Sequence, residues 1–246
     1  MKLSPSHKIY LGLVIVLSLF SALNVFLPQG SFLPPYQLPA PKSIIAVVTA
    51  LMMLVLYGGL GLVGLTLSRK LGFTETLDEQ VSNRQHFLIP ALVGSALGLF
   101  FIGADTILSQ FHSLGHLPHP PFPTSLVASI VASIGEEIIF RLFFISFWTW
   151  LISSILLKRK WQSQVFWVVT ALSAFAFAAA HLPSVMMLFS LKQFNQIPPA
   201  LLIEILLLNG TLSVAAAYYF RKYGFLAAVG IHFWADVVWH VIWGGC

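Results

Sequence analysis

Long apolar runs, each followed by a short basic or polar segment, constrain this sequence more than any other feature. Seven such runs follow one another, at about residues 9–27, 43–67, 86–109, 126–157, 165–182, 200–220 and 225–243. A run of about 20 predominantly apolar residues has the length of a helix that crosses a bilayer. Charged residues make up only 9% of the chain, whereas soluble domains contain about 25%. We therefore expect an all-α, polytopic membrane helical bundle.

The number of crossings depends on residues 184–199, which are amphiphilic and carry Lys192 and Asn195. Seven helices cross if this segment re-enters or lies at the surface, and eight cross if it spans. With seven crossings, ten loop Lys and Arg residues fall on one side and two on the other, while Arg141 lies inside a run. Because cytoplasmic loops carry an excess of Lys and Arg, we expect seven crossings and a cytoplasmic N-terminus.

The same clustering bears on location and partners. The net charge of +5 suggests nucleic acid, but the basic residues sit in short loops between apolar runs, as topology signals do. We expect no nucleic-acid partner, and a multi-pass protein of the plasma (inner) membrane whose surroundings are the lipid bilayer.

Local signals predict where helices begin and end. The fifth helix is expected to end at Leu182, because Pro183 follows and proline breaks helices. Residues 73–77 are expected to form a short interfacial helix. The chain is expected to divide into residues 1–110, with three helices and a linker, and residues 111–246, within a single membrane domain.

Three charged residues lie inside the fourth run, in the sequence ASIGEEIIFR. An ionised group at the centre of a membrane helix costs at least about 2.5–3.5 kcal/mol, so such groups mark functional sites by default. Glu137 and Arg141 have the i, i+4 spacing of an intrahelical ion pair. Glu136 is then left without a partner, as suits a group that takes and returns a proton. The alternative is a buried network of all three charges that only locks helix packing.

Two later helices carry histidines at helical spacing from other groups. Phe177 lies one turn before His181, and His232 lies one turn before Asp236. Two histidines and an unmatched Glu136 on three helices predict one shared site. Counted at about 1.5 Å per residue, His181 lies nearer the outer face than Glu136 or His232. Helix tilt, a break at Pro183 or different helix boundaries must close this gap.

Other polar residues have simpler interpretations. Asp105 and Glu204, near helix ends, are expected to be interfacial or interhelical hydrogen-bond partners. His112, His116 and His119 resemble a metal site, but they lie among prolines with no nearby acid or cysteine. We expect them to be interfacial polar groups.

The ordered motifs EExxxR at 136–141, FxxxH at 177–181 and HxxxD at 232–236 resemble the CAAX-processing and bacteriocin-processing (CPBP) family of intramembrane proteases. The resemblance, of the type II CAAX prenyl endopeptidase kind, covers roughly residues 125–238. It implies an intramembrane endopeptidase acting on a membrane-associated peptide or protein, either prenylated or of bacteriocin type. Residues 111–246 would then form the catalytic helical core.

The resemblance also assigns roles by motif position. Glu136 and His181 would activate a water molecule, and His232 with residue 236 would stabilise the oxyanion. The residues that would shape the site around them are Glu137, Arg141 and Phe177.

Position 236 departs from the commonest family pattern, because Asp stands in place of Asn. An ionised aspartate would repel an oxyanion, and three interpretations remain open. Asp236 is a neutral buried acid, or it hydrogen-bonds His232 and fixes its tautomer, or it joins Glu136, His181 and His232 around zinc or another divalent metal. We favour the metal-free versions, because no His-Glu-x-x-His helix supplies two ligands locally.

Two other functions compete with proteolysis. A non-catalytic membrane scaffold of the same family would not need the full set of polar groups. A small proton-coupled transporter would also use intramembrane carboxylates and histidines, but the sequence shows no internal repeat of the kind many transporters have.

Overall fold

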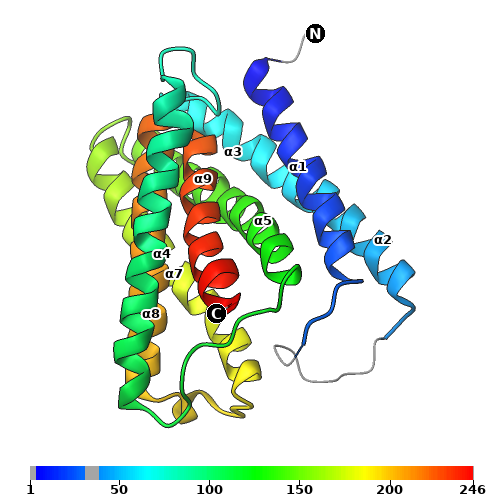
Figure 1. Ribbon diagram of the computed structural model, residues 1–246. Helices are drawn as coiled ribbons and strands as arrows, with labels where there is room; N and C mark the ends of the chain where they lie inside the picture. Colours follow the sequence, from blue (N-terminus) through cyan, green and yellow to red (C-terminus); the bar gives the residue numbers. More distant parts are fainter. Residues whose placement is uncertain (1–3, 31–38, 246) are drawn as a thin grey trace.

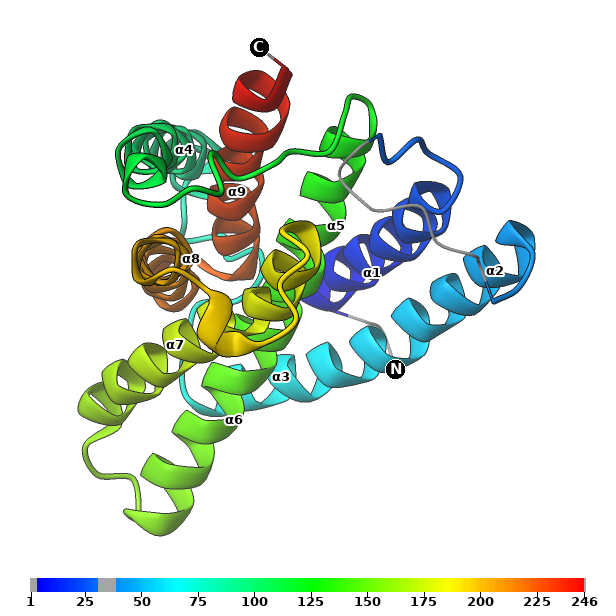
Figure 2. The same cartoon turned by 90° about the horizontal axis from the view of Figure 1, so that it is seen from below.

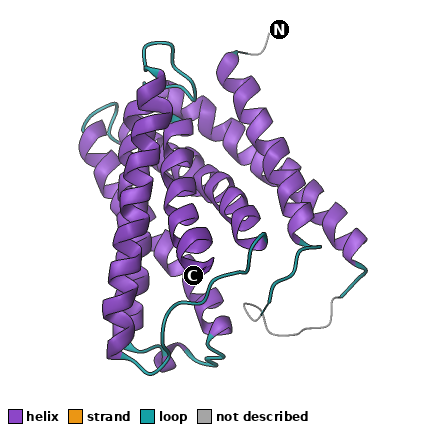
Figure 3. Cartoon of the chain, viewed as in Figure 1, coloured by secondary structure: helices purple, strands orange, loops and turns teal. Residues whose placement is uncertain are grey.

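The computed structural model describes residues 4–30 and 39–245. Helices form most of these residues, and no strand occurs among them (Figure 3). Within this part of the chain, seven helices are long and apolar enough to cross a membrane. The all-α polytopic fold is therefore confirmed.

The seven spans include three single helices and four compound ones. They are α1 (Pro5–Asn24), α2 to α3 (Lys42–Lys70), α4 with its flanking turns (Arg84–Phe111), α5 to α6 with the following turn (Thr124–Leu156), α7 (Gln162–Leu188), α8 (Pro199–Tyr223) and α9 with its last turns (Phe225–Gly245). Within the compound spans the α-helices proper are α2 (Lys42–Met52), α3 (Gly58–Lys70), α4 (Ile89–Leu108), α5 (Thr124–Glu137), α6 (Ser146–Thr149) and α9 (Phe225–Asp236), extended or joined by wider π-helical or tighter 3₁₀ turns.

The helices group around a central set that later forms the site. Seen from below, α5, α7 and α9 meet in the middle of the bundle, with α1 to α3 on one side and α4 and α8 on the other (Figure 2). In the side view α4 and α8 run alongside α9 (Figure 1).

Two glycines allow α4 to approach α9 closely. A Cβ at Gly94 would lie 2.3 Å from the carbonyl oxygen of Ile231, and one at Gly98 would lie 2.6 Å from Cβ of Val238. Small residues four apart are a common way for membrane helices to pack backbone against backbone. This contact fixes the position of α9.

Two local expectations are wrong. Helix α7 does not end at Leu182 but continues through Pro183 to Leu188. Inside a membrane bundle a proline removes one backbone hydrogen bond without ending the helix, because neighbouring helices hold the segment. Residues 73–77 form no helix; there Thr74 instead donates hydrogen bonds to the carbonyl oxygen of Arg221 at the end of α8.

The segment 189–198 does not span, since only a short 3₁₀ turn, Phe194–Gln196, interrupts it. This observation agrees with seven crossings rather than eight.

The basic loops gather at one end of the bundle. Ser6 of α1 and Arg69 of α3 both contact the carboxylate of Glu75, at 2.7 and 3.0 Å. Nearby, the side chain of Gln162 donates to the carbonyl of Leu71. Gly224, with φ of +89°, makes the turn between α8 and α9 at this same end, a conformation that glycine adopts without strain.

Candidate active site

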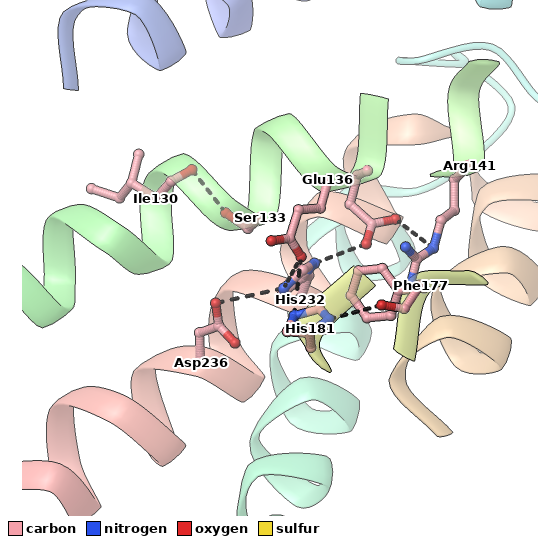
Figure 4. A network of polar contacts seen from close by, with 9 residues as sticks. Ile130, Ser133, Glu136, Arg141, Phe177, His181, His232 and Asp236 are labelled. Carbon is pink, nitrogen blue, oxygen red and sulfur yellow. Dashed lines mark hydrogen bonds and ion pairs between the residues drawn. The ribbon is translucent and has the colours of Figure 1, made fainter. Parts of the chain in front are cut away.

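Three helices bring the predicted polar residues together. Oε2 of Glu136 on α5 lies 4.0 Å from Nε2 of His181 on α7 and 3.8 Å from Nε2 of His232 on α9. Oδ2 of Asp236 lies 3.5 Å from the same nitrogen of His232. Figure 4 shows these four side chains pointing toward one another.

The length of α7 explains how His181 reaches the depth of Glu136 and His232. Because α7 extends six residues beyond Leu182, His181 lies within the span instead of at its end. The gap that the residue count predicted is thereby closed.

A cavity of about 240 Å³ opens beside these groups. Glu136 and His181 line it, each with a third of its side chain exposed. Oε2 of Glu136 is buried and has no hydrogen-bond partner among the described residues. Separations of 3.8 to 4.0 Å are too long for direct hydrogen bonds but suit a bridging water molecule.

The ring of His181 has a defined tautomer. Its Nδ1 lies 2.8 Å from the carbonyl oxygen of Phe177, which can only accept, so Nδ1 carries the hydrogen. The neutral ring then presents the lone pair of Nε2 toward Glu136.

His232 is held from the opposite side. Its Nδ1 donates to Oε1 of Glu137 at 2.9 Å, and Oε2 of Glu137 lies 3.1 Å from Nε of Arg141. All three side chains are 3% exposed or less. Glu137 therefore connects the buried arginine to the histidine, and Nε2 of His232 is the nitrogen left to face Glu136 and Asp236.

Phe177 is the packing centre of this group. The guanidinium carbon of Arg141 lies 4.5 Å from its ring centroid, a cation–π contact, and the rings of His181 and His232 meet its edge or face at 4.9 and 5.9 Å. A desolvated contact of this kind contributes about 2 kcal/mol, which offsets part of the cost of burying Arg141.

The serines of α5 lie outside this network. Ser129 and Ser133 donate to carbonyl groups of their own helix, at Ser125 and Ile130.

No group of three or more His, Cys, Asp or Glu side chains in residues 4–30 and 39–245 has the geometry to hold a metal ion. Nε2 of His232 lies between the carboxylates of Glu136 and Asp236, at 3.8 and 3.5 Å.

The cavity has further walls that spacing did not predict. They come from α7, α8, the end of α9 and the loop before α5, and the polar and loop members are Ser184, Asn209, His240, Leu117 and Pro118. No pattern in the sequence relates these positions to Glu136, because none of them lies on α5.

Two of the loop histidines contact acidic side chains. The side chain of His112 is 1% exposed, and its Nε2 lies 3.7 Å from Oε2 of Glu204. The side chain of His116 is half-exposed, and its Nδ1 forms a hydrogen bond of 2.6 Å with Oδ2 of Asp105. Asp105 on α4 and Glu204 on α8 thus contact histidines of the loop that precedes α5.

Residues 118–238 match the family described as Type II CAAX prenyl endopeptidase Rce1-like. The match spans just under half of the chain, and this segment is similar to that family. The Rce1-like segment contains all four converging side chains, and it supports an intramembrane CAAX-type protease in a multi-pass membrane protein. Comparison with curated proteins and with solved structures found no match.

Proposed function

We propose that the chain is an intramembrane endopeptidase in which Glu136 and His181 activate the water that attacks a peptide bond. The observation that supports this best is the buried, unpartnered Oε2 of Glu136, which faces the lone pair of His181 across 4.0 Å. A water molecule between them donates one hydrogen to each, so its oxygen lone pairs are free to attack.

The proton transfers follow from this placement. As the water oxygen bonds to the carbonyl carbon, its proton passes to Glu136, the general base. Glu136 then returns that proton to the amide nitrogen, the C–N bond breaks, and an acid and an amine leave.

His232 and Asp236 face the position where negative charge develops. Nε2 of His232 donates to the oxyanion from a protonated imidazolium ring, whose Nδ1–H donates to Glu137. Asp236, at 3.5 Å from this nitrogen, acts as a neutral acid that donates a second hydrogen bond. Glu137 thus holds the ring of His232 in position, so Asp236 is not needed for that role.

The finer assignments complete the proposal. The mechanism uses no zinc or other divalent metal. The substrate is a membrane-associated peptide or protein, prenylated or of bacteriocin type, and residues 111–246 form the catalytic core. The end that carries Arg69 and Arg221 is cytoplasmic, with the N-terminus, in the plasma (inner) membrane.

The test is cleavage of a membrane-proximal peptide library by the purified protein in liposomes. We expect Glu136→Ala and His232→Ala to abolish cleavage, and the matched control Glu79→Ala, in a polar loop, to leave it unchanged. A chelator should have no effect. Cleavage that persists in both site variants would eliminate the site, and loss with chelator alone would require a metal.

The same liposomes separate the competing functions. Proton-linked flux that is lost in Glu136→Gln, without any peptide cleavage, would favour a transporter. A scaffold would show neither activity.

A further inference from the structure

The loop between α4 and α5 forms one wall of the catalytic cavity. Leu117 and Pro118 line the cavity together with Glu136 and His232. Leu117 also packs against the buried cluster that contains Phe101. We call residues 112–119 the strap.

Each of the three strap histidines reaches a different helix. His112 places Nε2 3.7 Å from Oε2 of Glu204 on α8, and His116 places Nδ1 2.6 Å from Oδ2 of Asp105 on α4. The third contact joins Nδ1 of His119 to Nδ1 of His240, beyond α9, at 2.9 Å.

Two further contacts support the attachments of His116 and His119. Oδ1 of Asp105 accepts the backbone N–H of Leu117 at 3.0 Å. The ring of His119 meets that of Trp239 at 4.6 Å, nearly perpendicular. Asp105 therefore holds both the side chain of His116 and the backbone of the wall residue Leu117.

All these attachments pass through side chains. Within the described residues, no backbone–backbone hydrogen bond ties the strap to another element. The strap can therefore move away from the cavity when a few side-chain contacts break, whereas the helices around it keep their backbone hydrogen bonds.

The cavity is small for a polypeptide substrate. At about 240 Å³ it is below the roughly 300–1,000 Å³ of pockets that hold small ligands, so it does not enclose an extended peptide. Movement of the wall formed by Leu117 and Pro118 widens the space beside Glu136.

We propose that the strap is a gate through which the substrate polypeptide enters the site, latched by the contacts of His116 with Asp105 and of His119 with His240. The strap lies at the end of the bundle opposite the basic loops, because it connects the far ends of α4 and α5. The substrate therefore enters from that end. The inference rests on the proposed peptidase function, since it gives the gate its purpose.

The test measures gate opening without measuring proteolysis. Leu208 on α8 lines the cavity and is 4% exposed, so a cysteine there reacts with a charged maleimide only when the wall opens. The experiment uses Leu208→Cys in a Cys246→Ser background, alone and with His116→Ala, His119→Ala or the control His7→Ala. His7 is also a hydrogen-bonded histidine, but it lies on α1 next to Ser4.

We expect His116→Ala or His119→Ala to speed labelling about tenfold, because loss of one such hydrogen bond changes an opening equilibrium by about 5- to 30-fold. His7→Ala should label like the parent. Equal rates in all the proteins, no labelling in any, or an equal acceleration in His7→Ala would overturn the gate. A failure of the peptidase proposal would appear in the cleavage assay and leave these rates unchanged.

Discussion

Glu137 accepts a hydrogen bond at 2.9 Å from Nδ1 of His232, a residue 95 positions later in the chain. Its other oxygen lies 3.1 Å from Nε of Arg141, and the whole group is buried. One carboxylate thus neutralises the buried arginine and holds the ring of the histidine in position. The ion pair that helical spacing predicted is also the support of the site.

Glu137→Gln should destabilise the protein strongly. It leaves Arg141 as an uncompensated buried charge, and breaking a buried pair in this way costs about 3–5 kcal/mol. Adding Arg141→Met should recover much of the loss, because both charges are then absent. The free energy of unfolding in mixed detergent measures both effects, with the loop variant Glu79→Gln as control. A double variant no more stable than Glu137→Gln alone would contradict the pairing.

Asp236 provides a test of the oxyanion assignment. Because we propose that it donates a hydrogen bond as a neutral acid, Asp236→Asn keeps a donor at the same place, whereas Asp236→Ala removes it. We expect the asparagine variant to stay within about tenfold of the parent, and the alanine variant to lose about 10²–10³ in kcat, as for other single oxyanion donors. The measurement is kcat and KM for one cleaved peptide. Equal losses in the two variants would mean that the carboxylate itself is required.

The fold could be predicted because the bilayer leaves few choices. A run of apolar residues must satisfy its backbone within itself, and this makes it a helix. The rule does not apply to residues 73–77, where the predicted helix is absent. They lie outside the spans and attach to the end of α8. At Pro183 a rule from soluble helices was applied inside a bundle, where α7 continues to Leu188.

The site could be predicted only within single helices. The spacing of Glu137 with Arg141, and of His232 with Asp236, is i, i+4, and both pairs are close in space. Contacts between helices carry no such signal. His119 meets His240 across 121 residues, and nothing in the sequence relates them.

Phe177 should be a stability determinant while its neighbour on the same helix is not. Its ring is fully buried between Arg141 and two imidazoles, so Phe177→Ala leaves a cavity and removes the cation–π contact. Losses of about 3–5 kcal/mol are typical for such truncations. Phe175, two residues earlier, is 65% exposed on the outer face of α7. Phe175→Ala is therefore the matched control, expected to change the free energy of unfolding by no more than about 0.5 kcal/mol.

Two glycines of α4 should respond to alanine with opposite signs. A Cβ at Gly94 would lie 2.3 Å from the carbonyl oxygen of Ile231, whereas a Cβ at Gly103 meets nothing within 4 Å. Gly103→Ala should stabilise the helix by up to about 1 kcal/mol, because alanine is the better helix former. Gly94→Ala should instead destabilise by about 1–3 kcal/mol, because α4 and α9 must separate.

The separation of α4 from α9 in Gly94→Ala should also lower the cleavage rate. Ile231 precedes His232 on α9, so a displaced helix moves the histidine away from Glu136, and a misplacement of about 1 Å can cost about 10² in rate. Unfolding free energies and cleavage rates of Gly94→Ala and Gly103→Ala, measured side by side, check both effects. Two variants with the same sign of stability change would show that close packing of α4 on α9 does not position the site.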